Sequence, residues 1–325
     1  MEKAGTGSAG QHRRHPIQGR IRRREPRLVT KPKPPSPVAM WSSITARAKA
    51  ASRTSSKTPG ELQREYVYGR LLARVFADQD DSWVLKGGTA LLMRVEDARH
   101  SKDVDLLHRV RDLSAAEVDL RRVLAQDLGD WMRFVVTGTF PLGGDQQPDV
   151  SGMQVNVECF CGAQKIQAFH IDLVVGSLMT ADPDVAAAPS VIAVPQIDPP
   201  RLRLYPVVDH VADKVCATEA VYPGGRESSR VRDLVDLLVI ARTQQIDGSA
   251  LDAAIAGERT HRGLPGRDAF TVPAAWSTTY AKVAANTPSP SGFDEAVVLA
   301  GDFLDPVLQG AVSGLSWSPE TGRWA

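Results

Sequence analysis

A glycine pair followed closely by two alternating aspartates constrains the fold of this chain more than any other feature. Residues 85–91 read LKGGTAL, the pattern of a short strand that turns into a helix at Gly87 and Gly88. Glycine at such a turn lets backbone N–H groups approach a phosphate, which the helix N-terminus then attracts. The pattern predicts an α/β unit with a phosphate site at this turn, where Thr89 can add a hydroxyl.

The aspartates follow in residues 99–106, which read RHSKDVDL. On a strand, Asp103 and Asp105 project from the same face about 7 Å apart along the backbone, and the residues that alternate with them project into the core. Carboxylates at this spacing can converge on two divalent ions. A Gly-Gly turn or an Asp-x-Asp pair is common on its own, so it is their combination that predicts a site for phosphates and metal ions.

A third acid interrupts an apolar run in residues 170–175, which read HIDLVV. An unpaired charge would be costly to bury in such a strand, so a metal ion would be a natural partner for Asp172. The alternative is an aspartate at the exposed end of an edge strand. We expect His170 to point away from Asp172 and to have a structural role.

The second half of the chain contains two charged helical patterns. On the first, Lys214 lies at the margin of an apolar stripe formed by Val207, Val208, Val211 and Val215, where its ammonium could reach a triphosphate. On the second, Asp233 and Asp236 share one face, and Arg230 or Arg232 could pair with them. The alternative is that both helices simply carry solvated surface charges.

Apolar periodicity predicts the other elements. Helices are expected over residues 61–76, 89–95 and 114–128, and strands over 83–85, 104–107, 131–137, 153–160 and 166–175. Further helices are expected over residues 206–222, 228–242, 251–257, 273–285 and 292–308. These patterns predict an α+β fold with an α/β core over residues 61–182, a Pro-rich and Ala-rich linker or crossing loop over 183–200, and a helical C-terminal domain over 201–325.

Charge is divided unevenly along the chain. Residues 1–60 contain 14 Lys or Arg and 2 Glu, whereas residues 61–325 contain 25 basic and 36 acidic residues. The first segment contains one aromatic residue, Trp41, so we expect a basic, mostly disordered tail. It could bind nucleic acid, or it could be a solvated leader upstream of a true start at Met40.

The composition is that of a soluble globular protein, with 42% hydrophobic residues and 3 cysteines. No run approaches the roughly 18 apolar residues of a membrane helix, and the Arg-rich start lacks the apolar core of a signal peptide. We therefore expect no membrane partner and a cytoplasmic location. Cys159, Cys161 and Cys216 are expected to be reduced and structural, since no His lies at metal-ligand spacing from them.

Together, five ordered motifs give the chain a family resemblance. They are residues 86–91, the pattern Arg99-x-Ser101-x-Asp103-x-Asp105, the pair Ile171-Asp172, the pair Asp213-Lys214, and residues 232–237. Over residues 61–245 the chain resembles the AbiEii/AbiGii nucleotidyltransferase family, which includes the MenT-type toxins of toxin–antitoxin pairs. The resemblance implies a DNA-polymerase-β-like nucleotidyltransferase core, a mixed sheet flanked by helices, followed by a C-terminal helical bundle.

The resemblance also implies roles for individual residues. Asp103 and Asp105 would be the metal-binding pair, with Asp172 as a third metal-binding and catalytic carboxylate. Lys214 would bind the triphosphate, and Asp233 would complete the catalytic site. The nucleotide would contact residues from the first two motifs, namely Lys86, Gly87, Gly88, Thr89, Arg99 and Ser101.

The implied activity is Mg²⁺-dependent transfer of nucleotides from an NTP to the 3′ end of RNA, in characterised relatives tRNA, which would block translation. Two Mg²⁺ ions and a cognate antitoxin encoded nearby are implied as well. An acidic body must still bind RNA, so we expect a basic strip that includes Arg94, Arg99, Lys102, Arg226 and Arg230. The alternatives are a transferase that modifies a protein or a small molecule, and a catalytically silent nucleotide-binding regulator.

Overall fold

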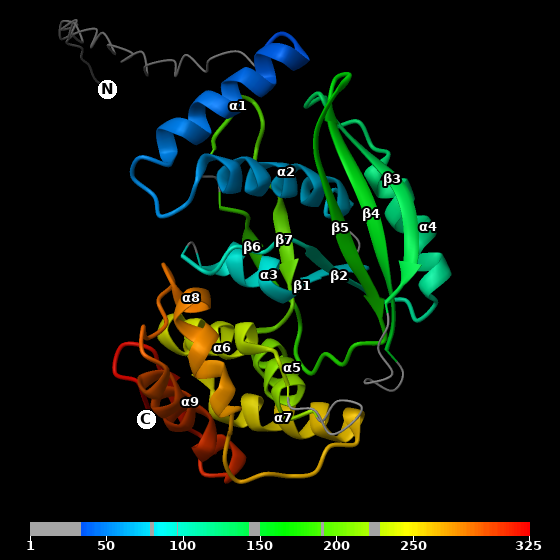
Figure 1. Cartoon of the computed structure of the whole chain (residues 1–325). Helices are drawn as coiled ribbons and strands as arrows, with labels where there is room; N and C mark the ends of the chain where they lie inside the picture. The colour runs from blue at the N-terminus through cyan, green and yellow to red at the C-terminus, as the bar shows by residue number, and fades with distance from the viewer. Residues whose placement is uncertain (1–33, 79–80, 96, 143–149, 190–191, 221–227) are drawn as a thin grey trace, which may run out of the picture. The chain divides into compact units, whose positions relative to one another are not determined.

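The computed structural model describes residues 34–78, 81–95, 97–142, 150–189, 192–220 and 228–325. The larger of its two sheets has seven strands in the order β3-β4-β5-β2-β1-β7-β6 among the described residues (Figure 1). The strands are β1 Trp83–Lys86, β2 Val104–His108, β3 Met132–Pro141, β4 Ser151–Cys161, β5 Gln164–Val175, β6 Asp184–Ala187 and β7 Arg201–Leu204. The β2–β5 and β1–β7 pairs are parallel and the others are antiparallel, so the expected mixed sheet is confirmed.

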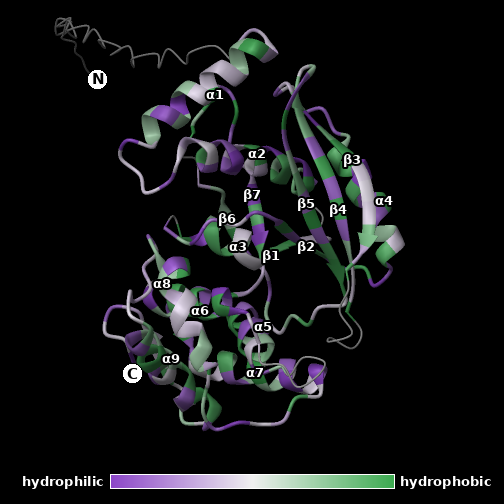
Figure 2. Ribbon diagram, in the orientation of Figure 1, coloured by the Kyte–Doolittle hydropathy of each residue, from purple (hydrophilic) through white to green (hydrophobic). Residues whose placement is uncertain are grey.

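Helices α1 Pro37–Ala51, α2 Pro59–Val75 and α4 Leu113–Leu124 contribute to the hydrophobic core on one face of this sheet. Helix α2 begins with a capping box, in which the Thr58 hydroxyl accepts from the Glu61 backbone N–H and the Glu61 side chain accepts from the Thr58 N–H. Val104 and Leu106 of β2 enter the same core and are fully buried. Along β4 and β5, hydrophilic and hydrophobic residues alternate, as expected for strands with one face packed on a core (Figure 2).

The expected disorder of residues 1–60 is wrong for its second half. Residues 37–51 form helix α1, which begins at the cap of Ser36 and carries Met40, Ile44 and Ala48, all fully buried, at four-residue spacing. This apolar stripe was obscured by the basic residues around it, and it packs into the sheet's core. The part of the predicted tail before residue 34 lies outside the described residues.

A buried ion pair joins α2 to the segment before β3. Arg74 is fully buried, and its Nη2 and Nη1 atoms donate to Asp130 Oδ1 and Oδ2 at 2.8 and 3.0 Å. Arg70 Nε adds a third bond to the same carboxylate at 2.7 Å. Burial acts to raise the pKa of Asp130, but the two guanidinium groups outweigh it and hold that pKa below its usual range.

The second half of the chain is helical, as expected, with α5 Val207–Glu219, α6 Val231–Thr243, α7 Gly248–Arg262, the 3₁₀ turn η1 Ala274–Trp276, α8 Ser277–Ala284 and α9 Phe293–Leu308. These helices share a separate core that contains Val211, Leu234, Leu251 and Trp317. Helix α3 Gly87–Arg94 also inserts Leu91 into this core, so it connects the two halves.

Three expectations about the second half need correction. The expected linker, residues 183–200, contains strand β6, which pairs with β7, and β7 belongs to the large sheet although it lies beyond the predicted boundary at residue 201. The helical part also includes a small sheet of β8 Ile246–Asp247, β9 Ser316–Ser318 and β10 Arg323–Trp324. Strands this short give no readable period in a sequence.

Among the described residues, no helix combines the length and the apolar character that a bilayer crossing requires. All three cysteines, Cys159, Cys161 and Cys216, are buried and unbonded to one another, as expected for structural thiols. Burial raises the pKa of Cys159 and of Cys216 to about 12.

Candidate active site

Gly87 and Gly88 are the first two residues of α3 and follow β1 directly, and other side chains lie close to both glycines. Gly87 has a φ of +63°, and a Cβ on it would lie 1.9 Å from Asp105 Oδ2. A Cβ on Gly88 would lie 3.1 Å from Ser101 Oγ. Gly87 is therefore required both for the left-handed backbone and for the room that the Asp105 carboxylate occupies.

Strand β2 places the two predicted aspartates beside this turn. Asp105 lies opposite Lys86 of β1 and opposite Asp172 of β5, so three charged residues from three neighbouring strands share one row. Since β5 lies between β4 and β2, the alternative of an edge-strand aspartate for Asp172 is wrong. The strands thus bring Asp172 next to Asp105 from a position 67 residues later in the chain.

Two hydroxyl groups hold Asp103 in place just before β2. Ser101 Oγ donates to Asp103 Oδ1 at 2.7 Å, and Thr89 Oγ1 donates to the Asp103 backbone carbonyl at 2.6 Å. Thr89 was predicted to bind the nucleotide. Its side chain is instead fully buried, and its hydroxyl holds Asp103 in position.

Burial and neighbouring charge destabilise the charged forms of Asp105 and Asp172. Burial, together with the neighbouring charges of Asp103 and Asp172, raises the pKa of Asp105 to about 7, although Lys214 and Lys86 act to lower it. Burial also raises the pKa of Asp172, with a contribution from Asp103. Such a group of carboxylates would be stabilised by a cation.

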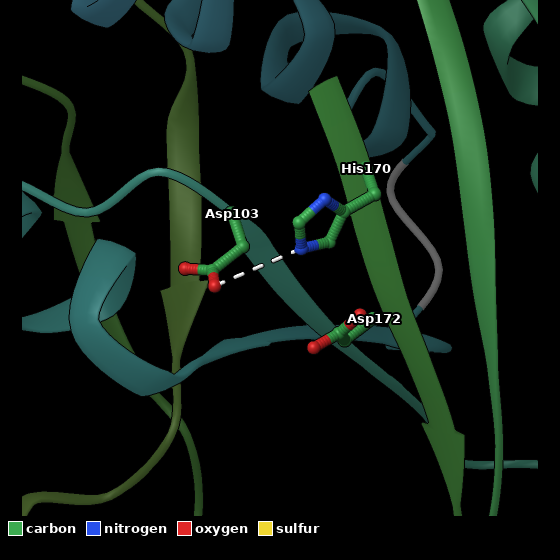
Figure 3. A group of neighbouring side chains, drawn as sticks. All are labelled: Asp103, His170 and Asp172. Atoms are coloured by element: carbon green, nitrogen blue, oxygen red, sulfur yellow. Dashed lines mark ion pairs between the residues drawn. The ribbon is translucent and has the colours of Figure 1, made fainter. Parts of the chain in front are cut away.

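His170 joins the same group (Figure 3). Donor atoms of Asp103, His170 and Asp172 all lie within 4.8 Å of one another, and His170 Nε2 lies 3.8 Å from Asp103 Oδ2. The expectation that His170 points away from Asp172 is wrong, because residues two apart on a strand project from the same face. Asp172 Oδ1 is buried and has no hydrogen-bond partner among the described residues. A buried carboxylate oxygen without a hydrogen-bond partner, close to possible metal-ligand atoms of Asp103 and His170, fits a site for a divalent cation.

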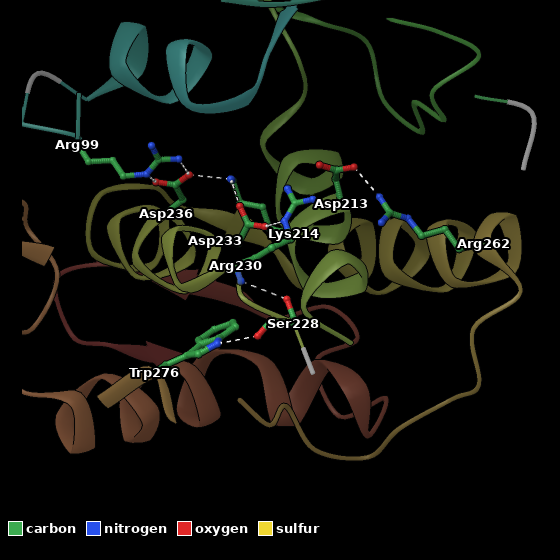
Figure 4. Close-up of polar contacts among 9 residues, drawn as sticks. All are labelled: Arg99, Asp213, Lys214, Ser228, Arg230, Asp233, Asp236, Arg262 and Trp276. Carbon is green, nitrogen blue, oxygen red and sulfur yellow. Dashed lines mark hydrogen bonds and ion pairs between the residues drawn. The ribbon is translucent and has the colours of Figure 1, made fainter. Parts of the chain in front are cut away.

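Lys214 lies in a buried charged network between α5 and α6 (Figure 4). Its side chain is nearly inaccessible, and Nζ donates to Asp233 Oδ1 at 3.0 Å and to Asp236 Oδ2 at 2.7 Å. Burial acts to lower the pKa of Lys214, but these two carboxylates outweigh it and raise that pKa. The alternative of a solvated helix lysine is therefore wrong.

Two arginines complete this network. Arg99 makes a bidentate pair with Asp236, with Nε–Oδ1 and Nη2–Oδ2 distances of 2.7 Å, and Arg230 pairs with Asp233. Both aspartates are buried, so the alternative that α6 carries only solvated charges is wrong. Of the two arginines proposed as partners, Arg230 pairs with Asp233, whereas the exposed Arg232 lines the pocket.

All these groups border one pocket of about 580 Å³. Its lining includes every predicted site residue except Thr89: Lys86, Gly87, Gly88, Arg99, Ser101, Asp103, Asp105, Asp172, Lys214 and Asp233. Lys86 is held at this wall, with Nζ 3.0 Å from Ser177 Oγ and 4.4 Å from the centre of the Tyr205 ring.

Sequence reasoning assigned no role to two further residues of the pocket, Asp213 and Ser177. Asp213 pairs with Arg262 Nη2 at 2.6 Å; burial acts to raise its pKa, but Lys86 and Arg262 outweigh it and hold that pKa well below its usual range. Asp213 directly precedes Lys214 in the fourth motif, so the sequence could have indicated that Asp213 belongs to the site. Ser177 follows the end of β5 in a segment without a motif, so nothing in the sequence indicated it.

Comparisons with known proteins agree with this chemistry. A sequence model described as the nucleotidyl transferase AbiEii toxin of a type IV toxin–antitoxin system matches residues 70–298, more than half of the chain. A search of curated proteins gave no match.

Solved structures give weaker likenesses. MenT4, a nucleotidyltransferase toxin from Mycobacterium tuberculosis H37Rv, is 16% identical with a TM-score of 0.49, over 82% of this chain and 98% of that chain. JHP933 from Helicobacter pylori is 13% identical with a TM-score of 0.41, over 76% of this chain and 92% of that chain.

Proposed function

Because the chain belongs to the AbiEii family of nucleotidyl transferase toxins, we propose that it transfers nucleotides from an NTP to the 3′ end of RNA, and that the acceptor is tRNA. The observation that carries this proposal is the convergence of Asp103, Asp105 and Asp172 beside the Gly87–Gly88 turn and Lys214 in one pocket. The reaction would take place in the cytoplasm, where a cognate antitoxin would restrain it.

The carboxylates would hold the divalent ions. Asp103 and Asp105 are the proposed pair, and Asp172 with its orphaned Oδ1 is the third ligand. Bound Mg²⁺ would neutralise phosphate charge and favour attack by the RNA 3′-hydroxyl. His170 adds a nitrogen donor to this oxygen set, which would also admit Mn²⁺.

The protein's own groups would bind and orient the triphosphate. The backbone N–H groups at Gly87 and Gly88, at the start of α3, would face phosphate oxygens, which the helix N-terminus favours. Lys214 supplies an ammonium whose charge is secured by Asp233 and Asp236. In this proposal Asp233 acts by positioning Lys214.

Attack by the 3′-hydroxyl on the α-phosphate forms one P–O bond and breaks the bond to the β-phosphate, so pyrophosphate leaves and the hydroxyl proton is released. Asp172, which lines the same pocket, is the candidate to accept this proton. The RNA 3′-hydroxyl and the α-phosphate would both lie in the pocket that Asp105 and Asp172 line.

The test is to incubate the purified protein with each labelled NTP, with Mg²⁺ or Mn²⁺, and with total RNA. We expect label at RNA 3′ ends, with tRNA the main product. Label on a protein or a small molecule would favour the transferase of different substrate, and binding of NTP without transfer would favour the silent regulator.

A further inference from the structure

Most of the expected basic strip is engaged elsewhere or lies outside the described residues, and of its five residues only Lys102 is exposed with no side-chain hydrogen bond or ion pair within the described part of the chain. Arg230 pairs with Asp233. Arg94 pairs with Asp184 at 2.5 Å and donates to the Tyr205 carbonyl, and Arg99 is committed to Asp236. Arg226 lies outside the described residues. Since residues 61–325 are acidic overall, an RNA acceptor would need more positive charge near the carboxylates than Lys102 supplies.

A second pocket, of about 390 Å³, lies beside the first and shares Ser177 with it. Its lining includes His108, Arg109, Arg111 and His261, and none of the nine described residues that line it is acidic. In an acidic body this is a concentration of groups that favour an anion.

Strand β2 connects the two pockets. Asp105 and Leu107 project from one face of the strand, and Arg109 continues the same alternation because its N–H donates to the Ser82 carbonyl at 2.8 Å, one step beyond the His108–Trp83 pair. Arg109 thus follows Asp105 by four residues, about 13 Å along an extended strand. Leu107 between them is buried against Val84 and Tyr205, so a single-stranded 3′ end that spans this distance would pass Ser177, which lines both pockets.

The two arginine side chains of this second pocket are accessible to a ligand. Arg109 and Arg111 are exposed, and within the described part of the chain neither side chain has a hydrogen bond or an ion pair. His261 Nε2 is buried and has no hydrogen-bond partner among the described residues. His108 differs, because Nδ1 accepts from the Val110 N–H and Nε2 lies 3.4 Å from Asp119.

We propose that Arg109, Arg111 and His261 form a phosphate-binding site for the acceptor RNA, which holds the strand while its 3′ end passes Ser177 and reaches the carboxylates. The site reads the sugar-phosphate backbone and not the bases, because guanidinium groups without a shaped base pocket contact phosphates in a sequence-independent way. This inference rests on the proposed transfer to RNA.

The test compares the double variant Arg109→Ala/Arg111→Ala with the wild type. The probe is a short labelled single-stranded RNA with a free 3′-hydroxyl, and binding is followed by fluorescence anisotropy at several salt concentrations. Removing two phosphate contacts should weaken binding and reduce the slope of log K against log salt by about 1.4. The apparent KM for NTP should not change. The control, Arg242→Ala/Arg323→Ala, removes two exposed arginines elsewhere and should bind RNA like the wild type.

Three results would overturn the proposal. An unchanged affinity and salt slope in the double variant would show that the arginines do not contact RNA. A raised KM for NTP with unchanged RNA binding would assign this pocket to the nucleotide. A wild-type protein that neither binds RNA nor labels it would refute the proposed function itself, which separates that failure from the first two.

Discussion

Replacing Asp105 with Asn should stabilise the protein in a pH-dependent way. The pKa of Asp105 is about 7 in the fold against an ordinary value of 3.8, because of burial and the charges of Asp103 and Asp172. The folded state therefore binds more protons than the unfolded state between these values, and stability falls as pH rises from about 4 through 7. Asparagine keeps the shape and carries no charge, so it removes this pH-dependent loss.

The size of the effect follows from the shift. At about 1.4 kcal/mol per pKa unit, a shift of about 3 units corresponds to at most about 4 kcal/mol above pH 8. Asp105 borders the open pocket, where water weakens the repulsion, so we expect about 2 to 4 kcal/mol. Below about pH 4 the variant and the wild type should differ little.

Urea unfolding at pH 4, 6 and 8.5 measures this difference directly. Asp252→Asn, which removes an exposed carboxylate from α7, is the matched control and should show no such trend. Adding Mg²⁺ at pH 8.5 should raise the melting temperature of the wild type more than that of Asp105→Asn. If the difference in free energy of unfolding between Asp105→Asn and the wild type stays constant or decreases as the pH rises, the argument from carboxylate repulsion is refuted.

Three other changes test the packing around the site. Lys214→Ala should lower the free energy of unfolding by about 3 to 5 kcal/mol, because it leaves Asp233 and Asp236 buried without their ammonium, and a urea melt that matches the wild type would contradict this. Arg74→Met should cost a similar amount by leaving Asp130 short of its bidentate partner, again measured by urea unfolding. Gly87→Ala should abolish nucleotide transfer, since its Cβ would occupy the place of Asp105 Oδ2, and retained transfer by a folded variant would show that the turn relaxes.

The elements that carry the site were predictable because their residue types are restrictive. The structure places Gly87 and Gly88 at the start of α3, and it places Asp105 on β2 with Asp103 directly before that strand. The third acid could also be found, because a charge inside an apolar run needs a partner. The family resemblance that combined these motifs is confirmed.

Other features depend on contacts that a sequence does not display. Helix α1 was missed because three buried residues, Met40, Ile44 and Ala48, lie in a strongly basic stretch whose composition suggested disorder. The burial of Lys214 depends on Asp233 and Asp236, which approach it only when α5 packs against α6. The position of His170 was derivable from strand alternation, and the prediction applied that alternation wrongly.

The central claim is that Asp103, Asp105 and Asp172 form one metal-dependent site for nucleotide transfer. The most direct measurement is the rate of label transfer from NTP to RNA by Asp103→Asn compared with the wild type, with and without EDTA. Asp252→Asn serves as the control. We predict that Asp103→Asn remains folded and loses at least about a hundredfold in rate, equivalent to about 2.7 kcal/mol of activation free energy, and that EDTA abolishes transfer by the wild type. Near-normal transfer by Asp103→Asn, or transfer that persists in EDTA, would contradict the claim.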